Sequence, residues 1–172
     1  MSTGIFPHQA FADVLSANSD FSSKFVDSAL AGTALRGLAI ITCMDSRISP
    51  LAIVGMEAGD AKILRNAGAR VTDDVLRTLV LATYLLGVSR VLVMPHTDCR
   101  MTQDDDAAIH EMIFKQHGVD TQSLEFRTVS DQRATLAMDV ARIRSFPYLP
   151  NDLIVGGAIY EVHTGTLEPI DC

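Results

Sequence analysis

Two short stretches of the chain end an apolar run with side chains that could bind a metal or take part in catalysis. The first supplies a thiol, a carboxylate and a guanidinium, at Cys43, Asp45 and Arg47. The second supplies an imidazole and another thiol three residues apart, at His96 and Cys99. Zinc is commonly bound by two thiolates and one imidazole, and a catalytic zinc keeps its fourth position for water. We therefore predict a catalytic zinc site on Cys43, His96 and Cys99.

Asp45 and Arg47 could form an ordinary exposed ion pair, but their position beside a ligand predicts a role at the metal. A carboxylate there could orient a hydroxide on the metal by accepting a hydrogen bond from it. An arginine that binds this carboxylate through two donors would hold it away from the metal. The arginine would also restore positive charge that two thiolates remove. If Arg47 released Asp45, the carboxylate could become the fourth ligand and close the site.

The same thiols admit other interpretations. Cys43 and Cys99 could be reduced core residues, because free cysteine is often buried. A cysteine phosphatase loop needs an arginine six residues after the cysteine, where this chain has Ser49. The sequence contains neither a Cys-x-x-Cys motif nor a phosphate-binding loop. We expect no role for the terminal Cys172.

The elements that must position these residues alternate between strands and helices. We predict strands over residues 37–42, 61–64, 91–94, 152–160 and 167–170. We predict a short helix capped by Ser49, and longer helices that begin after Thr72, at Thr102 and near Ser130. This order predicts an α/β fold, with a mostly parallel sheet of four strands plus a short C-terminal edge strand and helices on both faces. The carboxyl ends of neighbouring parallel strands converge, so the three ligands can meet.

The N-terminal arm, about residues 1–33, is predicted to contain one or two amphipathic helices. Its apolar side chains recur at Phe11, Val14, Leu15, Phe21 and Phe25. We expect this arm to pack on a partner subunit. The whole of residues 1–172 is otherwise predicted to be a single zinc-binding α/β domain.

Composition narrows the function classes. A net charge of −7 and an isoelectric point near 5.0 make binding to nucleic acid or to an anionic membrane surface unexpected. The sequence has no apolar run that could span a bilayer, and its first residues do not read as a secretory signal. Three cysteines do not suggest a disulfide framework. We expect a cytoplasmic protein.

Three motifs in order resemble the β-class carbonic anhydrases. They are Cys-Met-Asp-Ser-Arg at 43–47, Arg-Asn-Ala-Gly at 65–68 and His-x-x-Cys at 96–99. The likeness extends over residues 38–167 and includes a similar closing strand and turn. The short chain is most similar to the compact branch of the family, which also includes carbonyl sulfide and carbon disulfide hydrolases.

This resemblance implies zinc on Cys43, His96 and Cys99, with Asp45 and Arg47 as the catalytic pair. It implies reversible hydration of carbon dioxide to bicarbonate by a metal-bound hydroxide, in a homodimer or a higher homo-oligomer. It also implies that the segment 65–68 backs the pocket next to the metal, with Asn66, Ala67 and Gly68 as pocket residues. The alternative for this segment is a tight turn at the end of the second strand. Arg100 stands where the family usually has glycine. Its side chain could narrow the pocket, bind bicarbonate or point into solvent.

Three hypotheses follow from these observations. The first is a carbonic anhydrase. The second is hydrolysis of carbonyl sulfide or carbon disulfide by the same zinc site, because all three substrates are small, linear and electrophilic at carbon. The third is a non-catalytic zinc protein in which Asp45 permanently closes the coordination sphere. Arg47 beside Asp45 argues against the third hypothesis.

Overall fold

The structure is a computed structural model that describes residues 6–27 and 29–172. The chain divides into two compact units, one that ends at Leu30 and one that runs from Ala31 to Cys172. The organisation as one domain with an N-terminal arm stays a prediction.

The N-terminal unit consists of η1 (His8–Phe11) and α1 (Ala12–Lys24), which confirms the predicted helices. None of the described side chains of α1 is buried. Phe21 is 62% exposed and Val14 is 55% exposed, so the apolar face of the helix is open. A helix with an unburied apolar face gains little stability from packing within its own unit.

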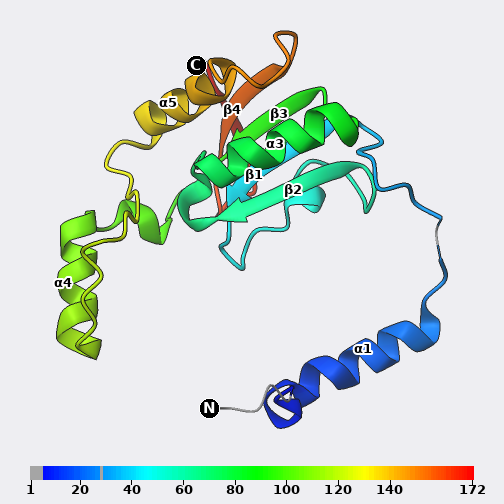
Figure 1. Ribbon diagram of the computed structural model, residues 1–172, viewed down its shortest axis with the longest axis horizontal. Helices are drawn as coiled ribbons and strands as arrows, with labels where there is room; N and C mark the ends of the chain where they lie inside the picture. The colour runs from blue at the N-terminus through cyan, green and yellow to red at the C-terminus, as the bar shows by residue number, and fades with distance from the viewer. Residues whose placement is uncertain (1–5, 28) are drawn as a thin grey trace. The chain divides into compact units, whose positions relative to one another are not determined.

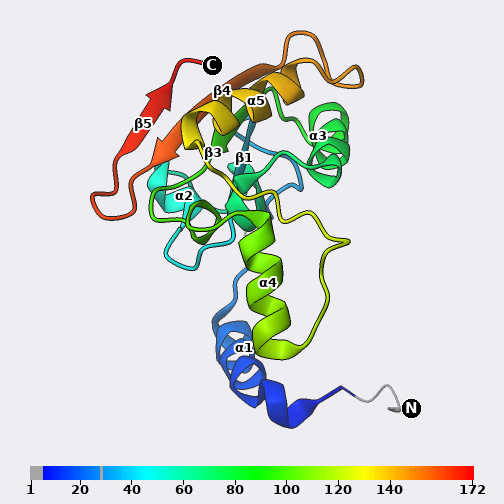
Figure 2. The ribbon, with the colours of Figure 1, turned by 90° about the vertical axis from the view of Figure 1, so that its left-hand side faces the viewer.

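Among the described residues, five strands form one sheet in the order β2-β1-β3-β4-β5 (Figure 1). The strands are β1 (Leu38–Cys43), β2 (Ala61–Asn66), β3 (Arg90–Met94), β4 (Ile154–Tyr160) and β5 (Leu167–Ile170). The first four run parallel, and β5 pairs antiparallel with β4 at the edge (Figure 2). Every residue of the interior strand β1, which lies between β2 and β3, is buried, as its apolar sequence predicts. The predicted α/β fold is confirmed.

Two long helices cover one face of the sheet. They are α3 (Asp73–Leu85) and α5 (Gln132–Arg144), and their apolar side chains form a core with Ile41 and Val93. Helix α5 packs so closely on β4 that a Cβ atom at Gly157 would lie 2.9 Å from Leu136 Cγ. This contact explains why glycine occurs within the strand. The opposite face packs against the short helix α2 (Pro50–Ile53) through a smaller cluster that includes Leu38 and Ile40.

Helix α4 (Asp106–His117) extends away from the sheet in both views (Figures 1 and 2). None of its described residues is buried. Two short 3-10 helices, η2 (Ala67–Ala69) and η3 (Arg100–Thr102), follow β2 and β3 at the carboxyl edge of the sheet. The helices among the described residues include none long and apolar enough to cross a membrane.

One predicted helix start is wrong, and one predicted cap residue makes no side-chain hydrogen bond. The hydroxyl of Thr102 donates to the Cys99 carbonyl at 2.8 Å within η3, so Thr102 does not cap α4. Asp105 caps α4 instead, and its carboxylate accepts from the Ala108 amide at 2.8 Å. The Ser49 side chain makes no cap hydrogen bond to α2, although Pro50 begins that helix as predicted. Thr72 does cap α3, through a hydrogen bond from the Val75 amide.

Candidate metal centre

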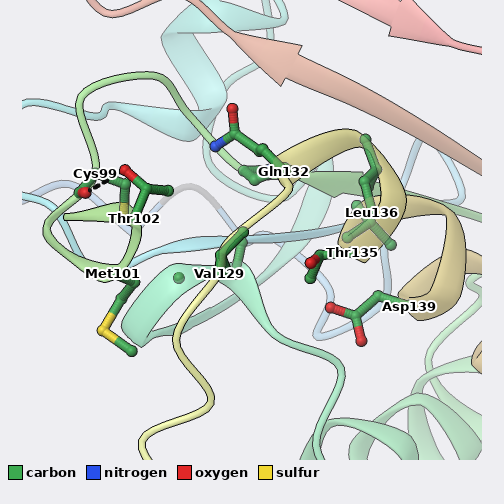
Figure 3. Close-up of a pocket in the computed structure, with 12 residues that line it drawn as sticks. Cys99, Met101, Thr102, Val129, Gln132, Thr135, Leu136 and Asp139 are labelled. Carbon is green, nitrogen blue, oxygen red and sulfur yellow. Dashed lines mark hydrogen bonds between the residues drawn. The ribbon is translucent and has the colours of Figure 1, made fainter. Parts of the chain in front are cut away.

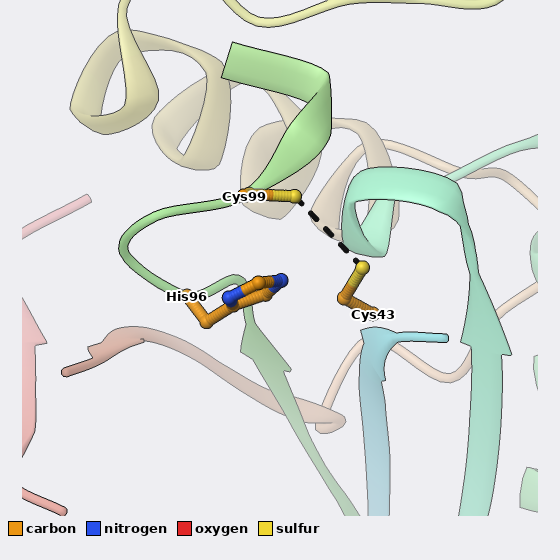
Figure 4. A group of neighbouring side chains, drawn as sticks. All are labelled: Cys43, His96 and Cys99. Atoms are coloured by element: carbon orange, nitrogen blue, oxygen red, sulfur yellow. Dashed lines mark hydrogen bonds between the residues drawn. The ribbon is translucent and has the colours of Figure 1, made fainter. Parts of the chain in front are cut away.

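Two strand ends bring the three predicted ligands together. Cys43 is the last residue of β1, while His96 and Cys99 lie on the loop between β3 and η3 (Figure 4). One ligand atom from each residue lies within 4.8 Å of the other two. The three residues are 4%, 0% and 3% exposed, so the cluster lies inside the protein. Two thiols and one imidazole at this spacing match the donor set that zinc prefers.

The His96 ring is oriented for metal binding. Its Nδ1 atom lies 2.8 Å from the Thr97 carbonyl oxygen, so Nδ1 carries the proton and Nε2 keeps its lone pair. Among the described side chains, Nε2 of His96 is a buried polar atom that has no hydrogen-bond partner. Burying such an atom without a partner is costly, and a metal ion would satisfy it. The carboxamide of Gln132 donates to the His96 carbonyl at 2.7 Å and fixes the backbone of this ligand.

The two sulfur atoms share one hydrogen bond at 3.9 Å. This bond lowers the pKa of Cys43, which also accepts from the Gly68 amide at 3.4 Å. The same bond, together with burial, raises the pKa of Cys99. Gly68 can turn its amide toward the sulfur because it has a φ of +77°, a backbone conformation that favours glycine. Burial acts to lower the pKa of His96, but the neighbouring Cys43 sulfur outweighs burial and raises it overall.

Asp45 and Arg47 form the geometry predicted for them. Nε of Arg47 donates to Asp45 Oδ1 at 3.0 Å, and Nη2 donates to Oδ2 at 2.8 Å. The Arg47 amide adds a third hydrogen bond at 2.9 Å. These bonds hold the pKa of Asp45 well below its usual range, so the carboxylate stays ionised. Asp45 Oδ2 lies 3.8 Å from His96 Nε2, beside the ligand atoms.

Asp98 is a part of the site that the sequence did not suggest. Its carboxylate accepts from Arg47 Nη1 at 2.7 Å, and its carbonyl accepts from Nη2 at 2.9 Å. Arg47 lowers the pKa of Asp98 through these contacts. Asp98 lies between His96 and Cys99 in the sequence, and this position within the motif could have identified it as a site residue. Its partner is 51 positions away in the chain and could not be read from that motif.

A cavity of about 440 Å³ opens beside the ligands. Its walls contain Cys43, Cys99 and Asp45, together with Ala67 and Arg100 of the predicted pocket. The Arg100 guanidinium is half-exposed and pairs with Asp104 at 2.5 Å. Its Nη2 atom lies 3.8 Å from the Met112 sulfur.

The other two predicted pocket residues, Gly68 and Asn66, do not line this cavity. Gly68 contributes its amide to the Cys43 sulfur. The Asn66 carboxamide makes two hydrogen bonds to the Arg70 backbone, at 2.7 and 2.8 Å. Asn66 lines a separate hollow at the start of α3. Its side chain therefore braces the turn that follows β2.

A second, much smaller cavity lies behind Cys99, between β3 and α5 (Figure 3). Its volume of about 10 Å³ leaves room for a single water molecule at most. Val129 and Leu136 provide part of its wall, and Gln132 and Asp139 reach it from α5. This cavity is too small to hold a substrate, so the residues around it are closely packed behind Cys99.

Comparisons with known proteins identify the family of the chain. A family model described as carbonic anhydrase matches residues 38–167. β-Carbonic anhydrase 1 of Mycobacterium tuberculosis is 31% identical over 92% of this chain and 96% of its own length. A carbon disulfide hydrolase of Acidithiobacillus thiooxidans is 29% identical over 78% of this chain and 77% of its own.

The fold of the chain agrees with that of a solved carbonic anhydrase. The crystal structure of a carbonic anhydrase from Streptococcus mutans has a TM-score of 0.88 and 35% sequence identity. The match covers 97% of this chain and 99% of that one. The residues that the family model matches include the strand ends that carry Cys43, His96 and Cys99. The chain therefore belongs to the β-carbonic anhydrase family.

Proposed function

We propose that the chain catalyses the reversible hydration of carbon dioxide to bicarbonate at a zinc ion held by Cys43, His96 and Cys99. The observation that carries this proposal is the buried Nε2 of His96, which has no hydrogen-bond partner among the described residues and belongs to a cluster in which the imidazole and two thiols lie within 4.8 Å. Zinc bound by this donor set would supply a Lewis acid that makes water a nucleophile near neutral pH.

Asp45 then acts as a fixed hydrogen-bond acceptor. Its ionised carboxylate has no proton to donate, so it would accept a hydrogen bond from a water molecule beside the three side chains and orient that water. Arg47 holds the carboxylate through two side-chain donors, which keeps it from turning freely toward the ligands. Asp98 in turn holds Arg47, so the acceptor is supported by two successive contacts.

Arg100 contributes positive charge to the cavity. Its pairing with Asp104 joins two partly exposed groups, and such pairs are weak. Neutral carbon dioxide gains little from this charge, whereas the bicarbonate anion is attracted by it. We therefore assign Arg100 an effect on bicarbonate binding, and Ala67 a purely steric one.

Hydrolysis of carbon disulfide or carbonyl sulfide is the second candidate. It is supported by the relative named carbon disulfide hydrolase. The same three side chains and the same Asp45 carboxylate would serve that reaction, because the central carbon of these substrates is electrophilic, like that of carbon dioxide. The non-catalytic alternative is disfavoured because Arg47 occupies both carboxylate oxygens of Asp45.

The proposal includes a homodimer or higher homo-oligomer. Its support is the open apolar face of α1, where Phe21 and Val14 are more than half exposed. Two β-carbonic anhydrases of Sordaria macrospora, which share the fold at 17% identity, are described as tetrameric.

A stopped-flow assay of zinc-loaded protein tests these proposals. Carbon dioxide, carbonyl sulfide and carbon disulfide are offered in turn, with chelator-stripped and zinc-restored protein as the matched control. We expect rapid hydration of carbon dioxide that is lost on stripping and returns with zinc. Sulfide release with feeble hydration would favour the second candidate. Inactivity toward all three substrates with zinc bound would refute a catalytic role.

A further inference from the structure

Arg65 makes an unusual set of contacts at the end of β2. Its Nε atom donates to the Cys43 carbonyl at 2.9 Å, and its Nη1 donates to the Ile48 carbonyl at 3.2 Å. Its Nη2 donates to the Asp45 carbonyl at 2.6 Å. One guanidinium therefore binds three backbone carbonyls of the turn that follows β1.

That turn, residues 43–48, carries the first ligand and both members of the acidic-basic pair. Apart from the side-chain pair of Asp45 and Arg47, its internal hydrogen bonds are few. The Ile48 amide donates to the Asp45 carbonyl at 3.1 Å, and the Arg47 amide donates to the Asp45 carboxylate. The Met44 amide also donates to the Asn66 carbonyl at 2.9 Å. A tight turn with so few internal bonds depends on outside donors to keep one conformation.

Two arginines thus hold the same aspartate from different sides. Arg47 binds the Asp45 carboxylate, whereas Arg65 binds the Asp45 backbone. Arg65 does not line the cavity beside the ligands, so it does not meet the substrate there. It is also largely exposed, so it contributes little to the apolar core.

We propose that Arg65 is a positioning residue that fixes the 43–48 turn and thereby sets where the Asp45 carboxylate stands relative to the metal ligands. The planar guanidinium presents donors in a fixed fork, which suits three separated carbonyls. A lysine ammonium is a compact charge and would reach fewer of them. The catalytic consequence rests on the function proposed above, whereas the conformational consequence does not.

The experiment compares Arg65→Gln and Arg65→Lys with wild type. Arg90→Gln is the control, because Arg90 is also an exposed strand arginine that donates to one carbonyl, that of Arg36, away from the ligands. Three quantities are measured on the full chain: zinc per chain, hydrogen exchange of the Arg47 and Ile48 amides, and kcat with KM.

For Arg65→Gln we expect unchanged zinc content and amide exchange in the turn about tenfold faster. We expect kcat to fall about tenfold or more, because a displaced acceptor misorients water, with KM within about twofold. Arg65→Lys should lie between Arg65→Gln and wild type, and Arg90→Gln should match wild type. If Arg65→Gln does not fold, Arg65→Lys carries the test.

Unchanged exchange and unchanged kcat in both Arg65 variants would overturn the proposal. Loss of zinc together with activity would also overturn it, because Arg65 would then support the ligand rather than Asp45. If wild type has no activity on any substrate, the proposed function fails, but the exchange of the Arg47 and Ile48 amides still tests the positioning role.

Discussion

The carboxyl edge of the sheet and helix α4 are held in place by different means. At the sheet edge the three ligands are at most 4% exposed and rest on the fully buried strand β1. Helix α4 has no buried residue among those described. It is fastened instead through Asp106, whose carboxylate accepts from the Phe126, Arg127 and Thr128 amides and from the Thr128 hydroxyl, at 2.6 to 3.2 Å.

This difference implies that the sheet edge is rigid, whereas helix α4 is more easily displaced. Apolar burial gives the sheet edge a single geometry, which a metal site needs. Helix α4 depends instead on polar contacts at Asp106 and His110, and a change of pH or a single substitution at Asp106 can weaken its attachment. Substitutions in the two regions should therefore differ in their effects, with loss of metal and activity at the sheet edge and loss of stability at α4.

The largest effect is expected for Cys43→Ser, which removes one ligand from the sheet edge. Zinc binding and activity should be lost together, because the serine hydroxyl is a poor zinc ligand. Zinc per chain and hydration rate measure this loss. Cys172→Ser, at the exposed terminal cysteine, is the control and should retain both properties. A zinc-replete Cys43→Ser variant would contradict the assigned ligand set.

Asp45→Asn should retain zinc and lose turnover about a hundredfold, because the carboxamide also presents donors to the oriented water. The measurement pairs metal analysis with kcat. Asp74→Asn, at an exposed aspartate paired with Arg77, is the matched control and should change neither. Full activity of Asp45→Asn would remove Asp45 from the reaction.

Asp106→Asn should lower the free energy of unfolding by about 1 to 2 kcal/mol at neutral pH, the range for weakened hydrogen bonds to a charged group. The Thr128 hydroxyl and the three amides lower the pKa of Asp106 from 3.8 to about 2. Its ionised form therefore stabilises the fold fully above about pH 4, and this stabilisation is lost as the pH falls toward 2.

Urea unfolding of wild type and Asp106→Asn at several pH values checks the predicted direction of this pH dependence. The difference between the two proteins should shrink on acidification. A difference that stays constant down to pH 2 would mean that Asp106 does not fasten α4 through its charge.

The smallest change in stability is expected at α1. Phe21→Ser should alter the free energy of unfolding by less than about 0.5 kcal/mol, because Phe21 is exposed. It should weaken self-association, which sedimentation at several concentrations measures, whereas Asn18→Ala should not. Unchanged association would exclude the Phe21 side of α1 from the subunit interface.

Much of the fold could be predicted because hydrophobic periodicity is a local property. The observed strand β5 has the predicted bounds, and β1 is shifted by one residue. The meeting of Cys43, His96 and Cys99 could be predicted because parallel strand ends converge. The supporting contacts could not, since the bonds of Arg47 to Asp98 and of Arg65 to Ile48 join segments distant in sequence. The start of α4 was mispredicted because Thr102 is used within η3.

The wide spacing of the two sulfur ligands has a consequence for the unfolded chain. Cys43 and Cys99 are 56 positions apart, yet their sulfur atoms lie 3.9 Å from each other. An ion bound by both would act as a cross-link, and the loop-closure estimate used for disulfides gives about 4 kcal/mol for a loop of this length. His96 and Cys99 alone would close only a very short loop. Zinc would thus tie the first half of the sheet to the second, and its removal would restore conformational entropy to the unfolded chain.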